Sequence, residues 1–279
     1  MDKTLLVAAN LPDLGQGALE ATLVEHGAGA DIPLHAHAAG QLSLVISGTL
    51  SLSDKRGWWL APPGRGIWVP PGVEHTACYA KASVHIKILF SPELSKSFPA
   101  HCHALAVSSF LHALACEALS LPQGEGDEKG DLMAKLIVIE ATKPRHDVGL
   151  FVPQGRDPRL VRVINRLLAN PSIDETLEDL SGVAMSSART LSRLFVSETG
   201  MTFGRWREHL RVVKAVDHLV RGESITQTAI SLGFGTASSF TTMFTRIMGT
   251  PPARYLKDFE KPRRPDAENP ADRPTADLR

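Results

Sequence analysis

The sequence lacks an excess of either charge and lacks any long hydrophobic run. Its 279 residues carry 30 Lys and Arg against 30 Asp and Glu, so charge alone does not establish a nucleic-acid partner. No apolar run approaches the ~20 residues of a membrane helix. The first residues, one Lys followed by acids and Pro, do not have the pattern of a secretory signal. We therefore expect a soluble, cytoplasmic protein with no membrane partner.

Cysteine is also scarce. Cys78, Cys102 and Cys116 are odd in number and far apart in the chain, so they do not form the even set of a disulfide framework. We expect reduced, buried thiols of the kind found in cytoplasmic proteins.

The neutral total hides a partition along the chain, whose length allows two domains of ordinary size. Residues 1–153 carry 11 Lys and Arg against 15 Asp and Glu, and they hold nine of the 11 histidines. Residues 154–260 carry 14 Lys and Arg against 11 Asp and Glu. An acidic, His-rich front and a mildly basic back predict two different functions.

The hydrophobic pattern changes within the chain as well. From about residue 17 to residue 90, short apolar runs alternate with Gly- and Pro-rich turns, which is typical of an all-β barrel. If the pair Trp58–Trp59 lies on a strand, its side chains point to opposite faces, and one of them lies at an interface. The spacing then predicts two helices, at 104–119 and 131–142.

The back of the chain reads as helical. Residues 145–159 resemble a linker, and Asp157-Pro158 opens a run of helices through Phe259 with no strand-like segment. The Pro-rich, charged residues 261–279 are nearly free of large apolar side chains and are predicted to be disordered.

The helical half contains an internal repeat. Residues 177–206 match residues 225–255, because Leu191, Phe195 and Gly200 stand 49 positions before Phe240, Phe244 and Gly249. Each copy reads as helix, turn and helix, with Ser187 or Thr236 placed to cap the second helix. Two such units can lay two recognition helices in adjacent segments of a major groove.

Three stretches of this repeat carry a resemblance to a family. LSRLFVSETGMTFGRWR, ITQTAISLGF and FTRIMGTPPARY resemble signatures of AraC/XylS-type transcription regulators, over about a hundred residues. The resemblance implies binding to double-stranded promoter DNA, and contact with RNA polymerase if the protein is an activator. It assigns nine DNA-binding positions: Ser187, Arg189, Ser192 and Arg193 in the first unit, and Thr236, Ala237, Ser238, Thr241 and Thr242 in the second.

Two departures from the family pattern affect this assignment. Met185 stands where the first turn usually holds Gly, and Thr242 stands where the second recognition helix commonly carries Arg. Because Arg gives the strongest direct readout of guanine, we predict that Arg189 and Arg193 supply most of the sequence discrimination. The alternative is that both are a solvated pair one helical turn apart.

Two histidine motifs mark the front half. They are GADIPLHAHAAGQLSLVISG, residues 29–48, and GRGIWVPPGVEHTACY, residues 64–79. Both resemble the motifs of cupin β-barrels, except that Gln41 replaces the Glu of cupin enzymes and Tyr79 replaces the usual Asn. Cupins form the sensory domain of many AraC-type regulators, and the most similar subgroup has the HxH-x3-Q motif and lies beside transporter genes.

These motifs and strand alternation give the candidates for effector binding: His35, His37, Gln41, Ser43, Trp68 and His75. The three histidines are able to bind a divalent metal ion such as Zn, Ni, Fe or Cu, with Gln41 as a neutral fourth donor. Because no carboxylate stands at the matched position, catalysis is disfavoured. A metal-free pocket and a sensory metal site both remain open, and Trp68 is either a core residue or a ligand platform.

The sequence as a whole predicts a multidomain α and β protein. Its parts are a cupin sensor barrel at 1–100, a helical dimerisation or coupling segment and linker at 101–153, a double helix-turn-helix domain at 154–260 and a tail at 261–279. We expect a homodimeric transcription regulator, activator or repressor, whose barrel senses a small molecule or metal. The alternatives are a metal-dependent cupin enzyme fused to a DNA-binding domain, and a constitutive DNA-binding protein whose barrel only dimerises.

Overall fold

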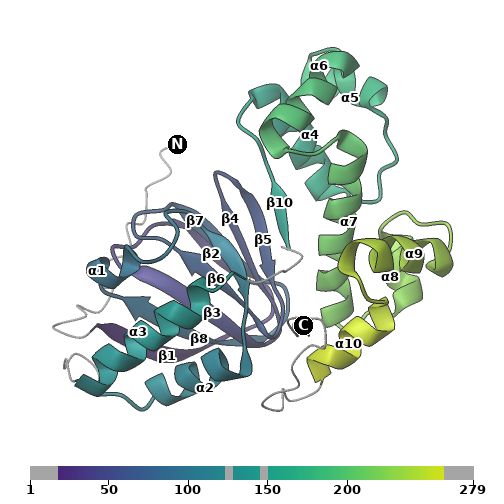
Figure 1. The fold of residues 1–279 in the computed structure, drawn as a ribbon. Helices are drawn as coiled ribbons and strands as arrows, with labels where there is room; N and C mark the ends of the chain where they lie inside the picture. The colour runs from purple at the N-terminus through teal and green to yellow at the C-terminus, as the bar shows by residue number, and fades with distance from the viewer. Residues whose placement is uncertain (1–17, 123–127, 145–149, 261–279) are drawn as a thin grey trace, which may run out of the picture.

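The computed structural model describes residues 18–122, 128–144 and 150–260. Within these ranges the chain forms a two-sheet β part followed by an all-helical part (Figure 1). The predicted class, a cupin-like barrel followed by a helical helix-turn-helix domain, is confirmed. The tail at 261–279, predicted to be disordered, lies outside the described residues.

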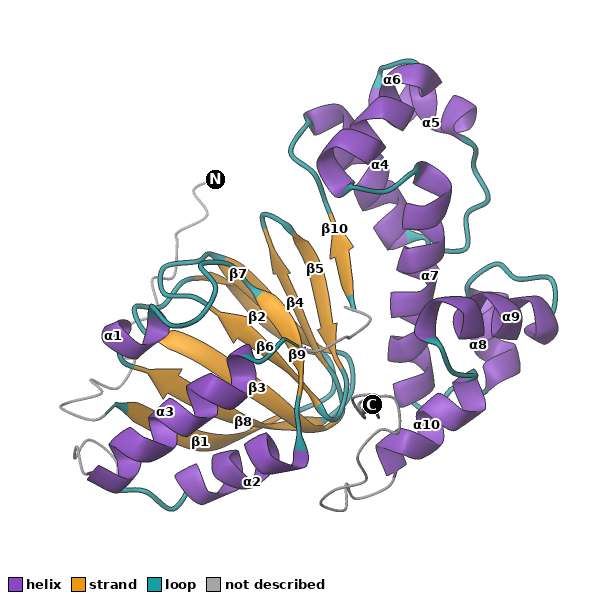
Figure 2. Cartoon of the chain, viewed as in Figure 1, coloured by secondary structure: helices purple, strands orange, loops and turns teal. Residues whose placement is uncertain are grey.

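The strands of the described residues form two five-stranded sheets, coloured orange in Figure 2. The first has the order β1-β8-β3-β6-β9 and the second the order β10-β5-β4-β7-β2. Neighbouring strands are antiparallel throughout. The bounds are β1 (Leu19–His26), β2 (Ala30–His35), β3 (Gly40–Ser47), β4 (Leu50–Asp54), β5 (Gly57–Ala61), β6 (Arg65–Val69), β7 (His75–Tyr79), β8 (Ser83–Phe90), β9 (His103–Ala106) and β10 (Phe151–Pro153).

Alternation along the strands separates a lumen from an outer core. On the first sheet Leu42, Ile86 and Ile88 point outward and pack with residues of α2 (Ser109–Ala118) and α3 (Glu128–Thr142). Figure 1 shows these two helices lying across that face, near the short α1 (Pro92–Ser95). The residues that alternate with them along each strand, including Ser43 and His85, therefore face the space between the sheets.

Two predictions about residues 101–153 were wrong in detail. The helix expected from Ala104 begins later, because residues 103–106 form β9, which pairs with β6. The linker expected at 145–159 contains β10, which extends the second sheet by pairing with β5. Short apolar runs do not distinguish strand from helix by spacing alone, and here pairing with a distant strand decides the outcome.

The helical part is built around one long helix. Asp157 caps α4 and Pro158 occupies its first turn, as the sequence predicts. α7 runs between the two helix-turn-helix units and carries buried Trp206, Leu210 and Val213 (Figure 1). The helices are α4 (Pro158–Ala169), α5 (Leu177–Ala184), α6 (Ala188–Leu194), α7 (Phe203–Val220), α8 (Ile225–Ser231), α9 (Ala237–Met248) and α10 (Pro252–Glu260).

The turn between α5 and α6 contains Met185, the first of the two departures from the family pattern. Met185 adopts φ 53 and ψ 45 at the end of α5, the conformation in which family members usually have Gly. The guanidinium of Arg162 donates to the carbonyls of Val183 and Ala184 and so stabilises this helix end. The turn thus forms without Gly, at a backbone cost that Gly would not incur.

We expect Met185→Gly to raise the free energy of unfolding by about 0.5–1 kcal/mol, because Gly removes the Cβ strain while losing more chain entropy. Urea unfolding of the full chain measures this difference. Met185→Ala is the matched control, since it shortens the exposed side chain but retains the Cβ. An equal gain from both variants would show that the exposed side chain, not the backbone, limits stability.

Candidate nucleic-acid interface and candidate effector site

The first recognition helix, α6, exposes two arginine side chains that have no partner in the described chain. Ser187 caps α6 by accepting from the Thr190 backbone N–H at 3.3 Å. Arg189, Ser192 and Arg193 follow on the helix and are exposed. Neither arginine forms a hydrogen bond or an ion pair with any described residue. Both side chains are therefore free to meet a ligand on that face.

Several other arginines of the helical part are engaged. Arg166 pairs with Glu175, Arg246 with Glu208 and Arg221 with Asp217. Arg211 donates to the carbonyls of Pro171 and Ile173, at 3.1 and 3.3 Å. These side chains stabilise the domain, which sets Arg189 and Arg193 apart from them.

The second recognition helix, α9, offers hydroxyls that are already in use. Thr241 and Thr242 donate to the carbonyls of Ala237 and Ser238, at 2.8 and 3.0 Å. Thr236 caps the helix by accepting from the Ser239 N–H at 3.1 Å. A hydroxyl bonded to its own helix keeps only acceptor capacity for a partner. Of the five predicted positions on this helix, Thr236, Ser238 and Thr242 are exposed, whereas Ala237 and Thr241 are half-buried.

A π-helical turn, Phe195–Thr199, continues α6. Its Glu198 accepts from the backbone N–H groups of Arg156 and Asp157, the latter at 3.0 Å. The end of the recognition helix is thereby tied to the start of α4 and to the segment that follows β10. Sequence reasoning missed this contact, because its partners lie 42 and 41 residues away and no local pattern marks it.

Three predicted histidines meet between the sheets. One ring nitrogen from each of His35, His37 and His75 lies within 4.8 Å of the others. The ring centroids of His35 and His75 are 4.2 Å apart, and those of His37 and His75 are 5.1 Å apart. His37 and His75 are buried, and burial lowers the pKa of both, that of His75 to about 4.

Backbone carbonyls fix the orientation of these three rings. Nδ1 of His35, His37 and His75 lies 2.9, 2.6 and 2.9 Å from the carbonyls of Pro33, Ala39 and Val73. Because a carbonyl only accepts, each neutral ring has its proton on Nδ1 and its lone pair on Nε2. Metal-binding histidines are usually held in this way. Nε2 of His37 is buried with no partner among the described residues, so the three rings fit a soft or borderline divalent cation.

The structure places the remaining candidates differently. Gln41 and Ser43 face the same space as the histidines, and the Gln41 amide donates to Ser43 Oγ at 3.0 Å. Trp68 does not join them, which corrects its prediction as an effector-binding residue. Its ring is fully buried on the outer face of the sheet, stacked on Phe98 at 3.9 Å, and its indole N–H donates to the carbonyl of Pro99.

A second ring cluster lies in the same space and was missed from the sequence. His26 stacks on Tyr79 at 3.8 Å, and His85 lies parallel to both at 5.5 and 5.8 Å. His85 is 2% exposed, its Nδ1 has no partner in the described chain, and burial lowers its pKa to about 4. The three rings come from β1, β7 and β8, so only the pairing of distant strands brings them together.

The buried imidazole of His85 makes stability depend on pH. Its pKa of about 4 in the folded chain is below the unfolded value of 6.5, so the unfolded state binds the proton first as pH falls. The stabilisation is present above pH 6.5 and is lost towards pH 4. We expect the free energy of unfolding to fall by about 2 kcal/mol between pH 7 and pH 5 from this residue alone. Urea unfolding of wild type and His85→Gln across this range measures the effect, and equal slopes would contradict it.

Both halves of the chain match known protein families. Residues 20–126 match the AraC-like ligand binding domain, and residues 180–258 match a helix-turn-helix domain. The chain belongs to the AraC family of transcriptional regulators. This AraC-type regulator binds DNA through its helix-turn-helix part and a ligand through its N-terminal domain.

The chain is similar in sequence to named regulators, and it aligns with a solved structure. The transcriptional regulator NimR of Escherichia coli is 27% identical over 80% of this chain and 82% of its own length. RipA of Corynebacterium diphtheriae is 35% identical over 42% of this chain and 37% of its own. The structure of ToxT from Vibrio cholerae aligns over 86% of this chain and 98% of its own, with 12% identity and a TM-score of 0.36.

The relatives are transcriptional regulators and not enzymes, which agrees with the expectation that this AraC-type regulator is not an enzyme. None of its helices in the described ranges is long and apolar enough to cross a membrane.

Proposed function

We propose that occupancy of the lumen between the two sheets controls how α6 and α9 engage promoter DNA. The observation that carries this proposal is the direct packing of the barrel on α7, the helix that joins both units. Leu60, Leu150 and Val152 belong to the same hydrophobic cluster as Trp206 and Val213 of α7. A change in the barrel can therefore alter the placement of both recognition helices.

Polar contacts reinforce this packing at β10. The indole N–H of Trp206 donates to the carbonyl of Pro153 at 2.9 Å. Nε2 of His209 lies 2.7 Å from the carbonyl of Phe151, and burial lowers the pKa of this imidazole. Two adjacent turns of α7 thus bind the backbone of the last barrel strand.

Further along α7, charged groups are buried against the barrel. Lys214 Nζ lies 4.3 Å from the centre of the Trp58 ring, and burial lowers its pKa. Asp217 is 3% exposed, pairs with Arg221, and accepts from the hydroxyl of Thr49 at 3.4 Å. Desolvated charges of this kind make an interface sensitive to small displacements of their partners.

The pair Trp58–Trp59 supports communication from the lumen to α7. Trp59 packs among the lumen residues and stacks on Phe151 at 3.8 Å, while its neighbour Trp58 faces Lys214. The two rings lie on opposite faces of β5, as the sequence predicts. A ligand that shifts β5 would move both rings, and its differential affinity for the two arrangements would set their populations.

A divalent metal is the first ligand to test, because His35, His37 and His75 fit one. If they bind it, added Zn or Ni raises the melting temperature of the full chain and changes its affinity for promoter DNA. His35→Ala and His75→Ala remove both responses and keep metal-free DNA binding, since the recognition helices lie elsewhere. His112→Ala, on the exposed face of α2, is the matched control. Equal metal content in wild type and the double mutant would exclude these histidines.

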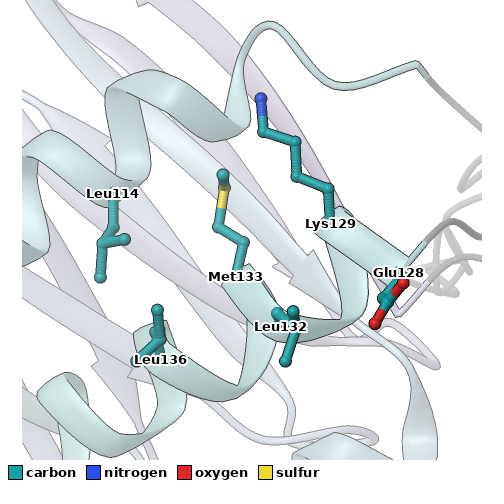
Figure 3. Close-up of a pocket in the computed structure, with 6 residues that line it drawn as sticks. All are labelled: Leu114, Glu128, Lys129, Leu132, Met133 and Leu136. Atoms are coloured by element: carbon teal, nitrogen blue, oxygen red, sulfur yellow. The ribbon is translucent and has the colours of Figure 1, made fainter.

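The exposed apolar face of α2 and α3 suggests self-association. Phe110, Leu132 and Ile139 are 52–54% exposed, and Leu132 and Leu136 line a groove with Leu114 (Figure 3). Contiguous apolar surface of this kind usually marks an interface. We propose that a second copy of the chain covers it. Light scattering of wild type and Leu136→Asp tests this, and identical masses would exclude the face as a dimer contact.

A further inference from the structure

The space between the sheets contains a cation that the proposed function does not use. Lys87 stands on β8 between Ile86 and Ile88, which are buried in the outer core, so its side chain points to the lumen. Its charge contributes to the lowered pKa of His26 and of His85. The ammonium group is therefore within electrostatic reach of the second ring cluster.

Two hydroxyl side chains flank Lys87 in register. Thr22 of β1 pairs with it on one side and Ser43 of β3 on the other. Side chains directly opposite on antiparallel strands have Cβ atoms ~4.5–5.5 Å apart. Because Ser43 Oγ accepts from Gln41, its own proton remains free to donate. Three neighbouring strands thus present a row of three donors, hydroxyl, ammonium and hydroxyl.

This row has no acidic partner in the described chain. Lys87 forms no hydrogen bond or ion pair with any residue of the described ranges. Glu20 shares the lumen face of β1, but it lies opposite Leu89, and no ion pair joins it to Lys87. A lysine in a protein interior usually has a partner of opposite charge, so this free ammonium group is available to a ligand.

One buried ring nitrogen in the same space also lacks a partner in the described chain. It is Nδ1 of His85, in a side chain 2% exposed. Buried polar atoms are normally hydrogen-bonded, so this nitrogen indicates the place of a polar ligand.

We propose that the effector is a small monocarboxylate whose oxygens bind the row formed by Thr22, Lys87 and Ser43. The inference rests on the proposed sensory function of the barrel. One ammonium group balances one negative charge, whereas a dianion would leave one charge uncompensated. A metal on the three histidines would add positive charge, and Gln41 supplies no carboxylate to offset it. The requirement for an anion therefore holds with or without metal.

The test compares carboxylates with uncharged analogues of the same shape. Acetate, butyrate and benzoate are titrated into the full chain against acetamide, butyramide and benzamide at constant ionic strength, by calorimetry and thermal shift. We expect about 10- to 100-fold tighter binding of at least one acid than of its amide. Lys87→Met should reduce this preference to about twofold, and Lys87→Arg should largely keep it. Lys81→Met is the matched control, because it removes an exposed lysine of the same barrel.

Each other outcome overturns the inference. Equal binding of acid and amide, equal preference in wild type and Lys87→Met, or no binding of any acid would remove Lys87 as the anion site. Tighter binding of inorganic phosphate than of any acid would overturn the carboxylate assignment. The melting temperature of each variant without ligand shows whether it is folded, and Lys87→Arg tests the charge if Lys87→Met is not. Promoter binding that responds to Zn but not to carboxylates would leave the sensory function standing and reject only this ligand.

Discussion

Replacing Arg189 or Arg193 by alanine is expected to lower operator affinity by ~1–3 kcal/mol and to relax preference at defined base pairs. The two side chains lie one turn apart on α6, are exposed, and have no partner in the described chain. Ser238→Ala and Thr242→Ala should cost less and leave the preferred sequence nearly unchanged. The Thr242 hydroxyl already donates to its own helix.

The measurement needs an operator selected from random duplex DNA and a scrambled duplex, both at one fixed salt concentration, because the phosphate contribution varies steeply with ionic strength. Arg246→Ala is a matched control, since its guanidinium pairs with Glu208. An equal loss on both duplexes would make Arg189 and Arg193 phosphate contacts. If the second-helix variants abolished specificity instead, the roles of the two helices would be reversed.

Trp206→Ala is expected to lower the free energy of unfolding of the helical part by ~3–5 kcal/mol, the usual cost of removing a large buried ring. Trp206 is fully buried, its ring lies 5.5 Å from that of Phe195, and its indole donates to Pro153. Because Phe195 directly follows α6, the same variant should weaken operator binding.

Trp206→Phe separates packing from hydrogen bonding, since it keeps most of the apolar contact but leaves the Pro153 carbonyl unpaired. Its expected cost is ~1–3 kcal/mol. Urea unfolding and fluorescence anisotropy with operator DNA measure the two effects. Ile230→Ala, at an exposed position of α8 in the same helical part, is the control and should change stability by less than ~0.5 kcal/mol. If Trp206→Ala lowered the free energy of unfolding by as little as the control variant does, the barrel and α7 would not be energetically coupled at the contact between Trp206 and Pro153.

The sequence predicts those features that depend on local pattern. The helix caps at Ser187 and Thr236 and the lumen orientation of His75 and Tyr79 follow from residue type and from alternation within one segment. Met185 was also marked as unusual by comparison with family members, and its positive φ shows why.

Features that depend on the pairing of distant strands were not predictable in this way. β9 and β10 have too few residues to carry a periodic signal, and their partners lie far away in the chain. The grouping of His26, Tyr79 and His85 and the row around Lys87 exist only because of the register among β1, β8, β3 and β7. For Trp68 the core alternative holds rather than the ligand platform, and the sequence left both open because motif spacing does not give the face of a strand that a core helix covers.

The short strand β10 also limits how far the DNA-binding half can travel. Gln154 still donates to the carbonyl of Arg56, and Asp157 already caps α4. Between them lie Gly155, at φ 79, and Arg156, whose backbone N–H is already bound by Glu198, so the connection is at most two residues, or about 7 Å when fully extended. If β10 stays paired, the helical half cannot detach and search for DNA on a loose tether. Because Trp206 and His209 also bind α7 to β10, we expect the helical half to move together with this strand, so that a shift of β10 displaces both recognition helices at once.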